Sequence, residues 1–172
     1  MQPLNLTPFP ILITDRLMLK QLELSDDKAI FALRSDDLIN QFIYREKAKT
    51  IKDAQDFIAK INNSIANNAS IYWAIKLKEN DELIGTICFW NIELKESIVE
   101  IGYELLTDYQ GKGLMQEALL AVVNYGFKIG FKTINACPNA ANLRSIKLLE
   151  KNNFKLIGEL KEENELIYAL IK

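Results

Sequence analysis

The stretch from Glu100 to Ala118, EIGYELLTDYQGKGLMQEA, constrains the fold more than any other part of the chain. It predicts a strand that ends near Leu106, a short turn, and a helix that begins at Gly111-Lys112-Gly113. Two glycines at such a junction leave main-chain N–H groups uncovered by side chains, and the helix dipole adds positive potential behind them. The junction therefore suits an anion such as a pyrophosphate.

Other readings of this junction are weaker or remain open. A phosphate-binding loop of the form GxxxxGK[ST] is absent, and the third glycine and following acidic residue of a dinucleotide fingerprint are missing. A GxG pair by itself is also compatible with a tight turn that binds nothing.

The remaining periodicity predicts a mixed α+β domain around one central, mostly antiparallel sheet of about seven strands, with about four flanking helices. Its length of 172 residues fits a single domain, 1–172, after an extended leader at 1–11. Ser25 is predicted to cap the first helix, with Asp26 and Asp27 in its first turn, and Thr50 to cap the second. Strands are predicted at 16–24, 71–77, 83–90, 98–106, 133–137, 154–160 and 166–171, and helices at 25–34, 50–65, 113–128 and 141–151.

Composition excludes several classes of function. The chain has no histidine, which removes Ser-His-Asp hydrolysis and His-ligated zinc, and no metal is expected. Its net charge of −2 argues against a nucleic-acid partner. No apolar run reaches the roughly 20 residues needed to span a bilayer. With two cysteines outside any CxxC spacing, we expect a cytoplasmic protein without membrane partners, as a monomer or homodimer.

Several motifs together resemble the GNAT superfamily of acetyl-CoA-dependent N-acetyltransferases. Gln110 to Met115 resembles the family's Q/R-x-x-G-x-G/A motif, and Asn142 to Phe154 resembles its N-x-x-S/A-x-x-L-x-x-x-G-F helix. The opening Thr14 to Leu19, TDRLML, is similar to the start of the RimJ/RimL branch, whose members acetylate ribosomal-protein N-termini. The resemblance covers residues 12–172 and implies a GNAT-like acyl-CoA N-acyltransferase fold.

The resemblance also implies which residues hold acetyl-CoA. The strands are expected to splay apart at Leu106 and Cys137 to admit the pantetheine arm. Asn142 and Ser145 would reach the pantetheine and the thioester end. Main-chain groups would bind the pyrophosphate at Gln110, Gly111, Lys112, Gly113, Leu114 and Met115, and the pantetheine near Leu105, Leu106 and Thr107.

Three positions depart from the family pattern. Met115 stands where the motif has Gly or Ala, and Asn153 replaces the glycine of G-F. Asparagine is suited to that place because it tolerates the left-handed conformation at a helix end. The tyrosine that serves many members as the acid is Leu149 here, so the proton donor must lie elsewhere.

Without histidine, a carboxylate or water ordered by one must deprotonate the amine. Glu100 and Glu104 lie on one strand at even spacing and so share a face; Glu100 aligns best with the family's base, and Glu104 is the second candidate. Ser145 is predicted to hydrogen-bond the thiol side. Cys88 and Cys137 are predicted to pack in the core, and Tyr72, Trp73, Phe89 and Trp90 to divide between core and acceptor groove.

The acceptor is the open part of the prediction. The RimJ/RimL resemblance favours a protein N-terminal α-amine. A small amine (a polyamine, an amino acid or an antibiotic such as an aminoglycoside), a non-catalytic acyl-CoA-binding module, and an unrelated α+β binding protein remain as alternatives.

Overall fold

The computed structural model describes residues 4–172. Two short 3-10 turns, at Leu24–Asp26 and Thr107–Tyr109, supplement the regular elements. The helices and strands follow the chain in the order β1 (Leu12–Ile13), β2 (Leu17–Gln21), α1 (Asp27–Ser35), α2 (Asp37–Asn40), α3 (Ile51–Ala66), β3 (Ile71–Leu77), β4 (Leu83–Glu93), β5 (Ile98–Leu105), α4 (Leu114–Ile129), β6 (Thr133–Ala136), α5 (Leu143–Lys151), β7 (Lys155–Leu160) and β8 (Glu165–Ile171).

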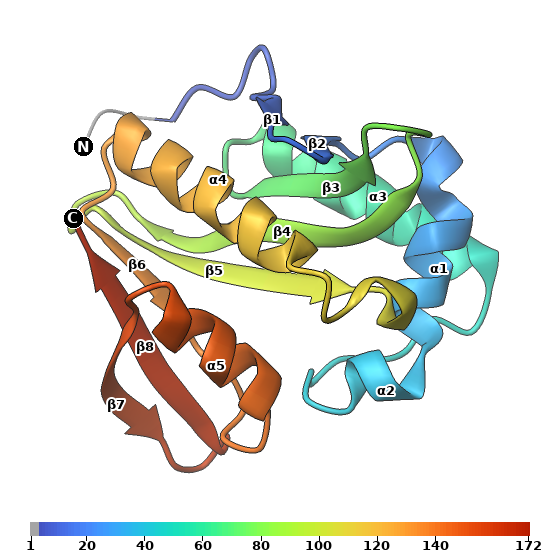
Figure 1. Ribbon diagram of the computed structural model, residues 1–172. Coiled ribbons are helices and arrows are strands. Elements are labelled where there is room, and N and C mark those ends of the chain that lie inside the picture. Colours follow the sequence, from blue (N-terminus) through green and yellow to red (C-terminus); the bar gives the residue numbers. More distant parts are fainter. Residues whose placement is uncertain (1–3) are drawn as a thin grey trace.

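All the strands form one mixed sheet in the order β1-β2-β3-β4-β5-β6-β8-β7 (Figure 1). Every neighbouring pair is antiparallel except β5 and β6, which run parallel. The expected α+β class and central sheet are confirmed. The sequence reading missed β1, which has two residues, and α2, which has four, because such short elements carry no measurable period.

The sheet separates two apolar cores. Helix α4 crosses one face, and α1 and α3 lie behind the other (Figure 1). Adjacent residues of β3 alternate between the cores: Trp73 and Ile75 pack with α4, and Ala74 packs with α1 and α3. The predicted leader is held at its end, because the Trp73 indole N–H donates to the carbonyl of Pro10 at 2.8 Å. Residues 1–3 of that leader lie outside the described residues.

The helix ends follow local capping chemistry. Thr50 accepts the N–H of Asp53 and caps α3, as predicted. The prediction that Ser25 caps the first helix is wrong. Asp26 accepts the N–H of Glu23 there, and its other oxygen lies 2.5 Å from the buried ammonium of Lys76. Asn153 has φ 67°, which confirms the left-handed end predicted for the helix that precedes Phe154.

Candidate active site

The turn before α4, which we call the glycine turn (residues 110–115), is built from main chain. Gly111 and Gly113 have φ of 75° and 76°, values that glycine adopts with little strain. Gly113 caps α4 without a side-chain hydrogen bond. Within residues 4–172, the N–H groups of 111–116 find no acceptor. A Cβ on Gly111 would meet nothing within 4 Å, so the turn opens outward and suits a phosphate group.

Side chains from the start of the chain hold this turn in place. Arg16 donates to the carbonyl of Lys112 at 3.0 Å and to Glu117 on α4 at 2.7 Å. Thr14 donates to the same carboxylate at 2.5 Å. Burial of Glu117 alone would raise its pKa, but these bonds prevail and lower it. The TDRL stretch therefore fixes the first turn of α4, a role that the sequence reading did not assign.

Strands β5 and β6 are paired along only part of their length. They pair only from Ile98–Thr133 to Glu100–Asn135, so the last five residues of β5 have no strand partner on that side. The Leu106 N–H donates to Ile84 on β4 at 2.8 Å, which places the Leu105 amide and carbonyl on the side of the gap. Gln110 donates to that carbonyl at 3.0 Å. The two strands were predicted to separate at Leu106 and Cys137, and in the structure they separate already after Glu100 and Asn135.

A cavity of about 590 Å³ lies at this gap. It is lined by side chains of β3, β4 and β5, by the segment between α2 and α3, and by the turn between β7 and β8. Trp73 and Phe89 are fully buried, which confirms the predicted core residues. Tyr72 and Trp90 line the cavity, and their place in an acceptor groove stays a prediction.

Glu100 and Glu104 both face the cavity, as their even spacing predicted. Glu100 is half-buried, and Asn91 donates to one of its oxygens at 3.0 Å. Burial raises the pKa of the Glu100 carboxyl, and the nearby charge of Glu165 acts in the same direction. Hydrogen bonds from Asn91 and Cys137 oppose this shift without cancelling it. A half-buried carboxylate with a raised pKa in a cavity is equipped to accept a proton.

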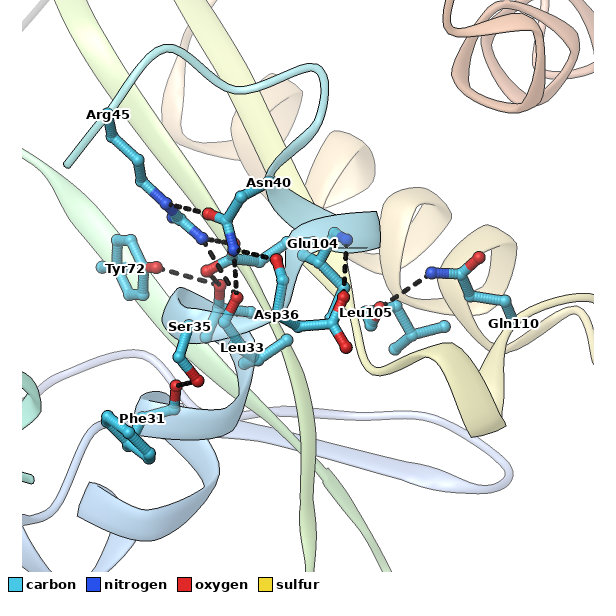
Figure 2. A network of polar contacts seen from close by, with 12 residues as sticks. Phe31, Leu33, Ser35, Asp36, Asn40, Arg45, Tyr72, Glu104, Leu105 and Gln110 are labelled. Atoms are coloured by element: carbon cyan, nitrogen blue, oxygen red, sulfur yellow. Dashed lines mark hydrogen bonds and ion pairs between the residues drawn. The ribbon is translucent and has the colours of Figure 1, made fainter. Parts of the chain in front are cut away.

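Glu104 has a different environment (Figure 2). Arg45 donates to one of its oxygens at 2.6 Å, and Thr86 donates to the other at 3.2 Å. Arg45 is itself fixed by Asn40 and by the carbonyl of Leu33. Both oxygens of Glu104 are therefore engaged, one of them in holding the segment between α2 and α3 against β5, and this carboxylate is the poorer base.

A pair of hydroxyl groups lies on the other side of β5. The Tyr103 and Ser145 hydroxyl oxygens are 2.7 Å apart, which joins β5 to α5 across the gap. Burial raises the pKa of Tyr103 to about 12, so its hydroxyl remains protonated. Asn142 accepts the N–H of Ser145 and starts α5. Leu149, at the position of the absent tyrosine, is fully buried.

The two cysteines line the cavity, so the prediction that they pack in the core is wrong. Cys88 is adjacent on β4 to the core residue Phe89, and alternation turns its side chain to the opposite face. Burial raises the pKa of each thiol to about 12. Both are thus neutral at ordinary pH and poor nucleophiles.

Comparison with known proteins now decides the family. Residues 16–155 match the model of the acetyltransferase (GNAT) domain. The chain belongs to the GNAT family of acetyltransferases. It is 36% identical over 155 residues to the uncharacterized N-acetyltransferase YoaA of Bacillus subtilis (strain 168), covering 90% of this chain and 88% of that one.

Solved GNAT structures have the same fold. A GNAT acetyltransferase from Bacillus anthracis superposes with a TM-score of 0.80 at 26% identity, covering 94% of this chain and 98% of that one. RimL, a ribosomal L7/L12 alpha-N-protein acetyltransferase, superposes with a TM-score of 0.85 at 19% identity, covering 95% and 94%.

Sequence reasoning missed Arg45, Tyr103, Asn91 and Arg34 as residues of this GNAT site. Arg45 lies in an irregular segment without periodicity, and strand alternation turns Tyr103 to the face of β5 opposite Glu104. Within residues 4–172, no group of three or more His, Cys, Asp or Glu side chains is arranged to hold a metal ion. No helix in the same range is long and apolar enough to cross a membrane.

Proposed function

We propose that this GNAT enzyme transfers the acetyl group of acetyl-CoA to a primary amine by direct attack, and that the amine is the N-terminal α-amine of a protein. One observation carries the proposal. The open glycine turn, the gap between β5 and β6, and the cavity that holds Glu100 adjoin one another. This arrangement supports the proposal, because acetyl transfer requires an anion site, a slot for an extended arm and a base in that order.

The donor would bind mainly through main-chain groups. The free N–H groups of the glycine turn, from Gly111 to Met115, suit the pyrophosphate, whereas the Gln110 N–H already donates to the carbonyl of Thr107. The gap-facing amide of Leu105 is available to pair with the pantetheine, whereas the Leu106 N–H is already used by Ile84. When bound, acetyl-CoA supplies an activated thioester. Thr107 and Asn142, at the two sides of the gap, would complete the donor site.

Glu100 is the base in this proposal. Its raised pKa favours proton uptake, and its position in the cavity brings it to the acceptor amine directly or through one water molecule. Glu104 would position the site by holding Arg45. This division of roles agrees with the absence of histidine from the chain.

The hydroxyl pair of Ser145 and Tyr103 is placed to act on the leaving side. Ser145 lines the cavity at the start of α5, and its hydroxyl contacts that of Tyr103. Ser145 would relay the Tyr103 proton to the departing thiolate, and water entering the cavity would then return a proton to Tyr103. Tyr103 thereby takes the place of the tyrosine that Leu149 replaces.

The choice of a protein α-amine rests on similarity and on shape. RimL is a ribosomal L7/L12 alpha-N-protein acetyltransferase, and its fold extends over nearly the whole chain. A cavity of about 590 Å³ that is open to one side would admit the end of an extended peptide.

Acetyl-CoA turnover tests the proposal, with released thiol as the readout and peptides that carry free or acetyl-blocked N-termini as acceptors. We expect release only with free N-termini, and mass spectrometry should place the acetyl group on the α-nitrogen. Turnover with polyamines or aminoglycosides alone would overturn the protein acceptor. Tight acetyl-CoA binding with no thiol release from any amine would overturn the enzymatic role.

A further inference from the structure

Arg34 is a cation of the cavity wall that the reaction above does not use. It lies on α1, is half-buried, and lines the cavity. Its guanidinium carbon stands 3.8 Å from the centroid of the Phe57 ring. Stacking of this kind fixes the plane of the guanidinium group while leaving its N–H donors free at the edges.

No described residue accepts those donors. Within residues 4–172, the Arg34 guanidinium makes no hydrogen bond and has no carboxylate within 4.0 Å. Its neighbour Arg45 is by contrast fully engaged with Glu104, Asn40 and the Leu33 carbonyl (Figure 2). The two guanidinium groups have one carboxylate between them, Glu104, and Arg45 binds it. One positive charge, that of Arg34, is therefore left unpaired at this end of the cavity.

That charge is held at a cost. Burial lowers the pKa of Arg34, and the adjacent charge of Arg45 lowers it further. A half-buried cation without a partner is unfavourable unless a ligand completes its hydrogen bonds.

The far side of the cavity has the opposite charge. Arg34 and Phe57 lie beside β3 and β4, whereas Glu163 and Glu165 approach from the hairpin of β7 and β8. In the sheet order, β5 with Glu100 stands between them. An acceptor bound here meets carboxylates around its amine and a cation at its other end.

We propose that Arg34 binds a carboxylate carried by the acceptor, so that the acceptor is an acid as well as an amine. This inference rests on the acetyl-transfer part of the proposed function and specifies the acceptor. The guanidinium would form two parallel N–H···O bonds with the carboxylate. Two sources share this chemistry: an acidic side chain close to a peptide N-terminus, and the α-carboxylate of a free amino acid or dipeptide.

Matched acceptor pairs test the inference. One arm compares peptides that differ only as Glu or Gln at the second or third position. The other compares amino acids and dipeptides with their C-terminal amides. We expect wild-type kcat/KM to favour the acid in one arm by about tenfold to a hundredfold, as charge-assisted hydrogen bonds in a partly buried site do. The arm that responds identifies the source.

Variants assign the preference to Arg34. Arg34→Gln should abolish it, and Arg34→Lys should keep only part of it because an ammonium group cannot form the two parallel bonds. Lys60→Gln on α3 removes the same charge from an exposed position and should leave the preference unchanged. Arg34→Lys also serves if Arg34→Gln proves unstable.

Failure of the inference differs from failure of the proposed function. Equal rates for acid and amide in both arms overturn the carboxylate site while acetyl transfer stands. If no amine turns over, binding of the same pairs to the CoA-loaded protein is measured by calorimetry. Equal binding of both members, or binding of neither, then overturns the inference, and acid-selective binding lost in Arg34→Gln supports it.

Discussion

The glycine turn and the cavity both adjoin the gap between β5 and β6 and are built in different ways. The turn presents main-chain N–H groups around two glycines of positive φ. The cavity wall consists of side chains from many elements, from α1 near the start of the fold to the hairpin of β7 and β8 at its end. A main-chain site tolerates most substitutions and restricts only its glycines, whereas a side-chain site depends on each partner.

Glu100→Gln should have the largest effect, because it removes the proposed base from the cavity while leaving the turn intact. We expect kcat to fall by about 10²- to 10⁴-fold with the KM for acetyl-CoA unchanged. The folded state raises the pKa of this carboxyl, so its charge is unfavourable at neutral pH and Tm should not fall.

The pH profile distinguishes a base from a binding contact. The wild-type rate should decline as pH falls through the raised pKa of Glu100, and this acidic limb should vanish in Glu100→Gln. Glu96→Gln, in the exposed turn between β4 and β5, is the control and should keep the limb. If Glu100→Gln kept the acidic limb of the pH profile, another group would be the base.

Arg45→Met should have the next largest effect, and it acts on stability. The Arg45 and Glu104 side chains are only 16% and 6% exposed, so the variant leaves a buried carboxylate without its cation. We expect the free energy of unfolding in urea to fall by about 3 kcal/mol. Removing both partners in Arg45→Met/Glu104→Leu should restore much of it.

Lys47→Met provides the matched comparison for Arg45. Lys47, in the same segment as Arg45, pairs with Asp37 on α2, but both side chains are largely exposed, and such pairs contribute about 0–1 kcal/mol. Equal losses in the two variants would show that the cavity wall does not depend on the buried ion pair.

Gly111→Ala, in the glycine turn, should have a moderate effect on acetyl-CoA binding. The added Cβ touches no protein atom, so the cost comes from the positive φ and from the Cβ standing before the N–H groups. We expect the KM for acetyl-CoA to rise by about tenfold, in line with roughly 1–2 kcal/mol for a left-handed residue. Gly158→Ala on β7, where the Cβ makes only ordinary contacts, should leave this KM unchanged.

The same contrast explains what the sequence predicted. The sheet, the helices and the glycine turn were readable because each has a local signature, such as alternation along β5 or the cap at Thr50. The roles of Arg45 and Tyr103 were not, since their partners Glu104 and Ser145 lie 59 and 42 residues away in the chain. Contacts between distant segments depend on the packed fold and leave no local pattern.

The smallest effect is expected for the cysteines, although both lie in the cavity wall where side chains matter most. With thiol pKa values of about 12, almost no thiolate exists at neutral pH. Cys88→Ala and Cys137→Ala should therefore keep kcat within about twofold, because the neutral thiol is a weak nucleophile. Loss of turnover in Cys137→Ala, together with an acetyl group on Cys137 in the wild type, would replace direct attack by a two-step transfer. Retained turnover in both variants leaves Glu100 and the hydroxyl pair as the reactive groups of the cavity.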